Sequence, residues 1–295
     1  MTTVFGVPTQ ALFGQLLIGL INGSFYAMLS LGLSVIFGLL NIINFTHGAQ
    51  YMMGAFVAYF LLHWWGLGYW WSLVIAPIVV GAFGVLLERT MLKRLYKLDH
   101  LYGLLLTFGF ALIIQGFLRN EYGSSGLPYS MPAQLTGGYN LGFMFLPVYR
   151  GWVIVFSLLV CLGTWFVIER TRLGAYLRAG TENPALVQAF GINVPRMITL
   201  TYGFGVGLAA LAGVLAAPIY QVNPLMGADL IIVVFAVVVI GGMGSIMGSI
   251  VTGFMLGVIE GFTKVFYPEA SNTVIFVIMA LVLLVKPTGL FGRAP

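Results

Sequence analysis

The chain alternates between long apolar runs and short polar connections. Nine runs are apolar enough to be membrane helices: 12–37, 49–62, 70–87, 101–118, 152–168, 197–217, 230–240, 246–266 and 273–285. Because a full crossing takes about 20 residues, the short runs 49–62 and 230–240 are candidates for a half-helix or re-entrant segment. The pattern predicts an all-α integral membrane protein, a polytopic bundle of 8–9 transmembrane helices with broken or re-entrant segments, in a single transmembrane domain spanning 1–295.

Composition agrees with a membrane protein and argues against an enzyme. Apolar residues make up 60% of the chain and charged residues 7%, whereas soluble domains carry about 25% charged residues; the mean hydropathy is +1.02. No lysine follows a glycine, so no phosphate-binding P-loop can form, and the H-E-x-x-H and G-x-S-x-G motifs are absent. Cys161 is the single cysteine. We therefore expect no catalytic residue, cofactor or metal in this chain, which leaves transport or conduction.

The charge distribution predicts which connections face the cytoplasm. The net charge of +5 arises from basic residues at the ends of apolar runs, a pattern that sets membrane orientation rather than binding to nucleic acid. Connections 88–100 and 169–196 each hold four basic residues and are predicted to be cytoplasmic, whereas 119–150 holds two and is predicted to be extracytoplasmic. The first 88 residues contain no Lys or Arg, which leaves the side of the N-terminus open.

The predicted extracytoplasmic loop contains Thr136-Gly-Gly-Tyr139 between two moderately apolar stretches. This pattern is compatible with a small hairpin that contacts an external protein, and equally with a solvated connector.

A polar break interrupts the apolar pattern after the first run. Five polar residues occur within ten positions: Asn41, Asn44, Thr46, His47 and Gln50. Polar groups at membrane depth are costly unless they find partners or line a wet cavity, so this segment is a candidate substrate pathway, together with Asn22 on the first run. The alternative is an inner loop whose Asn and Thr residues cap the next helix. For His47 we expect a capping or hydrogen-bonding role.

Glycines recur at spacings that favour close helix packing. Gly241, Gly242 and Gly244 form a second break, and Gly253, Gly257 and Gly261 repeat every fourth residue. The pairs Gly19 with Gly23 and Gly203 with Gly207 have the same spacing. Small residues four apart allow transmembrane helices to approach closely, so we expect these positions to be helix-packing sites.

Two acidic positions within apolar runs need an explanation. Glu260 and Lys264 are four residues apart, which favours an ion pair on one helix face. Asp229 begins an apolar run, where a carboxylate complements the helix dipole. The alternative is an ion-coupling carboxylate, which would make the chain a secondary transporter.

Residues 181–195 predict a short capped helix in a cytoplasmic connection. Asn183 is a good N-cap, Pro184 fits the first helical position, and Gly191 can adopt the left-handed conformation that ends the helix. The helix would have about two turns and a length of roughly 10 Å. A short rigid helix outside the membrane is suited to binding by another protein.

Three motifs carry a resemblance to a known family. They are Gly38-Leu-Leu-Asn-Ile-Ile-Asn-Phe-Thr-His-Gly-Ala-Gln50, Arg170-Thr-Arg-Leu-Gly-Ala-Tyr-Leu-Arg-Ala-Gly180 continuing into 182–191, and Val239-Ile-Gly-Gly-Met-Gly-Ser-Ile-Met-Gly248. Together they strongly resemble the branched-chain amino acid ABC transporter permeases of the LivH type, over almost the whole chain. Segment 182–191 is similar to the family's EAA coupling loop, but Asn183-Pro184 departs from the plain EAA pattern.

The resemblance implies a subunit of an importer in the bacterial cytoplasmic (inner) membrane. It implies a second permease subunit, identical or homologous, two cytosolic ATPases that bind ATP-Mg, and an extracytoplasmic substrate-binding protein. The residues it implies for ATPase coupling are Glu182, Asn183, Ala185, Leu186, Ala189, Phe190 and Gly191. The implied substrate is a branched-chain (aliphatic) amino acid, moved by alternating access; the alternative from the same motifs is urea or a short-chain amide.

Overall fold

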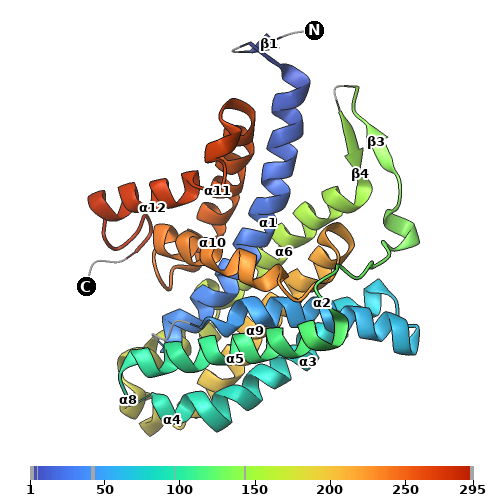
Figure 1. The fold of residues 1–295 in the computed structure, drawn as a ribbon. Helices are drawn as coiled ribbons and strands as arrows, with labels where there is room; N and C mark the ends of the chain where they lie inside the picture. The colour runs from blue at the N-terminus through green and yellow to red at the C-terminus, as the bar shows by residue number, and fades with distance from the viewer. Residues whose placement is uncertain (1–2, 5, 41–43, 97, 143, 293–295) are drawn as a thin grey trace.

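The computed structural model describes residues 3–4, 6–40, 44–96, 98–142 and 144–292. The chain is built from helices, which confirms the predicted all-α polytopic class (Figure 1). The first half contains α1 (Thr9–Leu40), α2 (Thr46–Trp65), α3 (Tyr69–Leu87), a π-helical turn η1 (Glu88–Leu92), α4 (Lys93–Leu95) and α5 (His100–Tyr122). The second half contains α6 (Val148–Arg170), α7 (Arg172–Glu182), α8 (Pro184–Ala189), α9 (Val194–Tyr220), α10 (Met226–Gly241), α11 (Ile246–Phe266) and α12 (Val274–Val285). Short 3-10 turns η2 (Ala133–Leu135) and η3 (Pro268–Ala270) complete the helical elements.

Six of the described helices are long and apolar enough to cross a membrane: α1, α5, α6, α9, α11 and the continuous segment Tyr69–Leu95. Helices α10 and α12 are apolar but shorter, with 16 and 12 residues. Helix α2 has 20 residues because it begins at Thr46, inside the polar break. Of the two short apolar runs in the sequence, 230–240 is thus the one that remains short as a helix.

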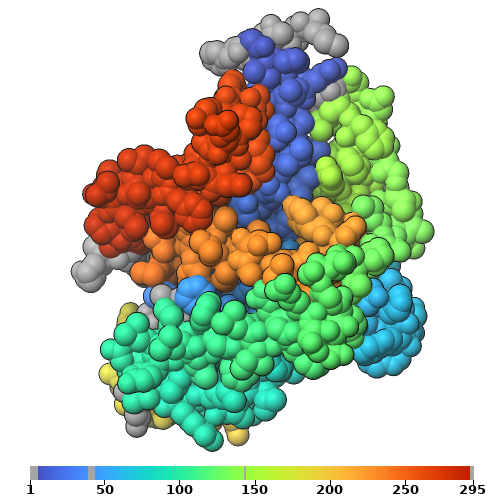
Figure 2. Space-filling model, viewed as in Figure 1, coloured from blue at the N-terminus to red at the C-terminus, as the bar shows by residue number. Residues whose placement is uncertain are grey.

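Large apolar side chains lie on the outer surface, as expected for a protein in lipid. On α5, for example, Leu101, Leu105 and Ile113 are exposed. Figure 2 shows α12 projecting beside α11, and Leu284 and Val285 near its end are almost fully exposed. Such extensive apolar surface is unusual in a soluble monomer and matches a hydrocarbon environment.

Glycine allows α1 and α11 to lie side by side. A Cβ atom placed on Gly19 would lie 2.6 Å from the carbonyl oxygen of Gly257, and one on Gly253 would lie 2.6 Å from the Cα of Ala27. No larger side chain fits between the two backbones at these positions, which explains their close approach. Gly261 packs against α1 in the same way, at Gln15 and Gly19.

The glycine-rich break at 241–244 lies at the junction of α10 and α11. Gly241 packs on the backbone of Gly248, and Gly242, with φ +101°, lies against Gly289 and Gly292 of the C-terminal segment. Gly244, with φ +80°, approaches Gly38 at the end of α1.

The connection between α5 and α6 contains the small antiparallel hairpin that the sequence allowed, while its contact with an external protein stays a prediction. Its strands are β3 (Gly138–Asn140) and β4 (Phe145–Pro147), with Tyr139 opposite Leu146. A second two-stranded pair, β1 (Thr3–Val4) and β2 (Val7–Pro8), precedes α1. Leu127 pairs with Val222 through two backbone hydrogen bonds of 2.8 and 2.9 Å, which fixes the start of the α5–α6 connection beside the turn after α9.

Candidate functional site

Helix α8 has the caps that the sequence predicts. The Asn183 side-chain oxygen accepts a hydrogen bond from the Leu186 backbone N–H at 3.0 Å, and Pro184 is the first helical residue. At the other end Gly191 has φ +80° and donates to the Gln188 carbonyl at 2.9 Å. The Ile192 N–H reaches the Val187 carbonyl, so the helix closes with a Schellman motif. The predicted capped helix is confirmed, with six residues.

One side of α8 is anchored and the other is free. Val187 is buried, whereas Leu186 and Phe190 are 55% and 77% exposed. The remaining residues implied for coupling are also exposed, namely Glu182, Asn183, Ala185, Ala189 and Gly191. Leu186 and Phe190 are four positions apart and therefore share a face of the helix, which places an apolar pair on a polar surface connection.

Helix α7 supports α8 from the end of α6. The Arg178 guanidinium donates to the Ile168 carbonyl at 3.0 Å and lies 3.4 Å from the Glu169 carboxylate. Gly174 packs directly on the Ile168 carbonyl, where any side chain would clash. These contacts fold α7 back against α6 and fix the direction from which α8 projects.

The polar break after α1 lies inside the protein. Asn44, Thr46, His47 and Gln50 are all buried, while Asn41 lies outside the described residues. Thr46 donates to the Thr107 carbonyl of α5 at 2.8 Å, so it acts as an interhelical contact and not as a helix cap.

His47 joins α2 to α1 and belongs to a cluster that is incompletely hydrogen-bonded. Its Nε2 lies 3.0 Å from the Leu29 carbonyl, which agrees with the predicted hydrogen-bonding role. Asn44 donates to Gln50 at 3.3 Å. Within the described residues, Asn44 Oδ1, His47 Nδ1, Gln50 Nε2 and the Tyr202 hydroxyl have no hydrogen-bond partner. Buried polar atoms normally have partners, so this cluster has the capacity to bind further polar groups.

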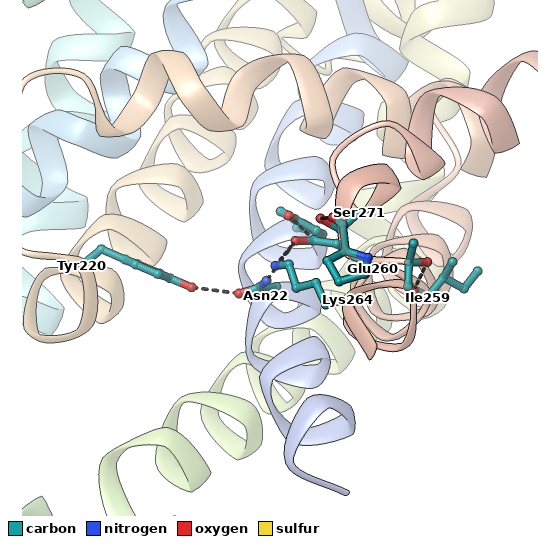
Figure 3. A network of polar contacts seen from close by, with 9 residues as sticks. Asn22, Tyr220, Ile259, Glu260, Lys264 and Ser271 are labelled. Carbon is teal, nitrogen blue, oxygen red and sulfur yellow. Dashed lines mark hydrogen bonds and ion pairs between the residues drawn. The ribbon is translucent and has the colours of Figure 1, made fainter. Parts of the chain in front are cut away.

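Asn22 is the predicted pathway residue that lies next to open space. It lines a pocket of about 360 Å³ formed by α1, α2, the end of α9 and the start of α10. Tyr220 donates to Asn22 Oδ1 at 2.9 Å, and Asn22 Nδ2 donates to Glu260 at 3.4 Å (Figure 3). The described pathway residues therefore fall into two groups. Asn22 lines this pocket, and the others lie in the buried segment around His47.

Glu260 is the centre of this polar network. Its carboxylate is buried and accepts hydrogen bonds from the Tyr26 hydroxyl at 2.6 Å and the Lys264 ammonium at 2.5 Å (Figure 3). The expected ion pair between Glu260 and Lys264 is therefore present. Since Asn22, Tyr26 and Lys264 all donate to the carboxylate, its charge is compensated within the fold, which favours a structural role.

Sequence reasoning missed the aromatic walls of the pocket and a second buried carboxylate. Tyr26, Tyr51 and Tyr220 line the pocket, but nothing in their spacing separates them from other aromatic residues of an apolar chain. Glu88 is buried although it begins a basic connection, and no sequence motif singled it out. For the pocket, the one signal in the sequence was the turn 221–223, in which Gln221 and Asn223 interrupt two apolar runs.

The fold defines a polytopic α-helical membrane protein whose polar contacts link separate helices and whose short capped helix projects from its surface. The chain belongs to the family described as "Branched-chain amino acid transport system / permease component", whose model matches residues 15–283. The resemblance carried by the three motifs is thereby confirmed.

Individual relatives match the chain nearly end to end. It is 34% identical to the high-affinity branched-chain amino acid transport system permease protein BraD of Pseudomonas aeruginosa, over 95% of each chain. It is 31% identical to LivH of Escherichia coli strain K12, also over 95% of each chain. The permease protein LivM of the same strain is 30% identical, over 90% of this chain and 67% of LivM. No solved structure matches the chain significantly.

Proposed function

We propose that this chain is a membrane-spanning permease subunit of an ATP-binding-cassette importer for branched-chain amino acids, in a bacterial cytoplasmic membrane. The names of its relatives describe high-affinity branched-chain amino acid transport. ATP hydrolysis in separate subunits drives the cycle, since the sequence has no P-loop. A substrate-binding protein delivers the amino acid from the extracytoplasmic side.

The observation that carries this proposal is the exposed face of α8. Leu186 and Phe190 present apolar surface on a rigid, doubly capped helix. Helix-in-groove binding uses apolar anchors four residues apart, which is the spacing here. We infer that each ATPase subunit binds this face. Movement of the ATPase subunits on ATP binding then shifts α8 and switches the bundle between outward-open and inward-open forms.

A second permease subunit completes the pathway. Escherichia coli strain K12 has two different permease proteins named for this transport system, LivH and LivM, and both are similar to this chain. This favours pairing with a homologous permease, and pairing of two identical chains is the alternative. This chain, carrying an affinity tag, is co-expressed with the homologous permease from the same genome. Co-purification of the homologue supports mixed pairing, and its absence from the purified complex supports pairing of two identical chains.

The test of the proposal is ATPase association. We expect Phe190→Glu to abolish co-purification of the ATPase subunits with the tagged permease in detergent. The variant permease by itself should still elute in size-exclusion chromatography at the position of the parent permease without ATPase. Tyr139→Glu on the β3–β4 hairpin is the matched control, because Tyr139 is also an exposed aromatic residue but lies in the predicted extracytoplasmic loop. Full retention of the ATPase by the Phe190→Glu variant would refute the coupling assignment.

A transport assay tests the substrate. Proteoliposomes that hold the complete complex, ATP and the cognate binding protein should accumulate radiolabelled leucine and not urea. Accumulation that requires a proton or sodium gradient and no ATPase would instead support a secondary transporter.

A further inference from the structure

The pocket beside Asn22 is lined by one carboxylate together with amide, hydroxyl and apolar groups. Its volume of about 360 Å³ lies within the roughly 300–1,000 Å³ that is usual for small-molecule sites. It lies near the middle of α1, at residues 22–26 of a helix that extends from Thr9 to Leu40.

Asp229 is the charged group that lines this pocket. It lies in the first turn of α10, is exposed, and makes no ion pair within the described residues. A carboxylate on an apolar helix is costly against lipid, so its position on a pocket wall is the favourable one. A cationic group of a ligand would give it the partner that the described residues do not supply.

A hydrogen-bond donor, the Asn223 side-chain amide, lies on the neighbouring wall. Asn223 Oδ1 accepts from the Leu225 backbone N–H at 2.9 Å, and the Asn223 Nδ2 group makes no hydrogen bond within the described part of the chain. An amide nitrogen in this position can donate to an anionic ligand group. The Tyr220 hydroxyl, which is hydrogen-bonded to Asn22, lines the same wall.

The remaining wall is apolar. Phe25 on α1 and Met226 and Leu230 on α10 line the pocket between these polar groups. Methionine and aromatic side chains adapt well to aliphatic ligands of slightly different shape. The pocket therefore has separate environments for a cation, an anion and a branched aliphatic group.

The pocket walls are held by contacts from distant parts of the chain. Asn22 and Tyr26 both donate to Glu260 of α11, which fixes the α1 wall from behind (Figure 3). The pairing of Leu127 with Val222 holds the predicted extracytoplasmic loop against the turn between Tyr220 and Asn223. Gln221 in this turn has φ +61°, a left-handed conformation that is uncommon outside glycine.

We propose that this pocket binds the transported solute as a zwitterionic aliphatic amino acid. The ammonium group pairs with Asp229, the carboxylate accepts from the Asn223 Nδ2 group, and the aliphatic side chain contacts Phe25, Met226 and Leu230. The proposal rests on the proposed import of branched-chain amino acids and adds the position and orientation of the solute. The loop that carries Leu127, predicted to be extracytoplasmic, pairs with the turn beside this pocket.

Photo-crosslinking of the complete importer complex tests the site. The probe is photo-leucine, a diazirine analogue that keeps both charged groups, illuminated with the complex in lipid nanodiscs. We expect peptides spanning 220–230 to be labelled, and labelling to be competed by leucine but not by 4-methylpentanoic acid, which lacks the amino group. Labelling confined to other segments in a complex that imports leucine would overturn the site and leave the proposed function intact. A complex that does not import leucine would overturn both.

Variants test the orientation independently. Asp229→Asn should lower leucine import roughly tenfold or more, because the negative charge that pairs with the ammonium group is lost and the remaining hydrogen bond is weaker, and Asp229→Glu should restore part of it. The matched control is Glu269→Gln, an exposed acidic position in η3 whose substitution should leave import unchanged. ATPase co-purification should be normal in all three variants. Leu230→Phe narrows the apolar end, so leucine import should fall more than valine import; equal losses would contradict the assignment of the side-chain position.

Discussion

Thr199 of α9 donates a hydrogen bond to the buried carboxylate of Glu88 at 2.7 Å, across 111 residues of sequence. The other carboxylate oxygen accepts from the Tyr96 hydroxyl at 2.6 Å. Glu88 begins the π-helical turn η1, and such turns are frequent where helices must deform. Since α9 begins just after α8, this contact links the end of α3 to the helix that follows the projecting α8.

The Glu88 contact predicts a stability effect that depends on one hydroxyl. Thr199→Val removes a donor from a buried carboxylate, which costs about 1–3 kcal/mol, whereas Thr199→Ser keeps it. We expect the apparent Tm of the detergent-solubilised protein to fall for the valine variant and to remain near that of the parent for the serine variant. Equal Tm values for all three proteins would mean that the hydrogen bond contributes nothing to stability.

The Glu260–Lys264 pair predicts non-additive substitutions. Lys264→Met leaves a buried carboxylate with neutral donors only and should be strongly destabilising, because the remaining charge has lost its counter-ion. The combination with Glu260→Gln should be less destabilising than the sum of the two single changes, with a coupling energy of about 0.5–3 kcal/mol. Thermal unfolding of the four proteins measures this cycle, and strict additivity would contradict the structural ion pair.

The same Glu260→Gln variant distinguishes a structural carboxylate from an ion-coupling one. If Glu260 is structural, leucine import by the variant complex should still depend on ATP and remain insensitive to collapse of the proton gradient. A parent protein whose import disappears when the gradient is collapsed, and a variant that has lost this sensitivity, would identify Glu260 as a coupling group.

Close packing of α1 on α11 predicts opposite outcomes for two glycine-to-alanine changes. Gly253→Ala places a Cβ 2.6 Å from the Ala27 Cα and should destabilise the protein by about 1–3 kcal/mol through overpacking. Gly116→Ala on α5 meets no atom within 4 Å and should be neutral or stabilising, because alanine is the better helix former. Comparison of Tm values for the two variants checks the contact, and a neutral Gly253→Ala would argue that the helices are further apart.

The caps of α8 predict a graded effect on ATPase binding. Asn183→Ala removes the side-chain acceptor for the Leu186 N–H, at a cost of about 1 kcal/mol to the helix, while Asn183→Asp retains an acceptor. The alanine variant should bind purified ATPase several-fold more weakly in a pull-down titration, and the aspartate variant should match the parent. Equal binding by the alanine variant would indicate that the ATPase does not require a preformed helix.

The sequence by itself determined the features that depend on neighbouring residues. Apolar runs identified the helices because only a long apolar segment is stable in hydrocarbon. Asn183, Pro184 and Gly191 identified α8, since each acts through the backbone within one turn. Glycine spacing on α11 indicated a packing face for the same local reason, although it did not name the partner helix.

Only the tertiary structure decided which distant side chains meet. Asn22 and Glu260 are separated by 238 residues, and their contact depends on the crossing of α1 with α11. Glu88 begins a basic connection, and only the structure shows that Thr199 and Tyr96 donate hydrogen bonds to its carboxylate. The pocket at Asp229 likewise requires α1, α2, α9 and α10 together. In a chain that is apolar almost everywhere, periodicity marks many possible faces, and steric fit between whole helices selects the pairs that form.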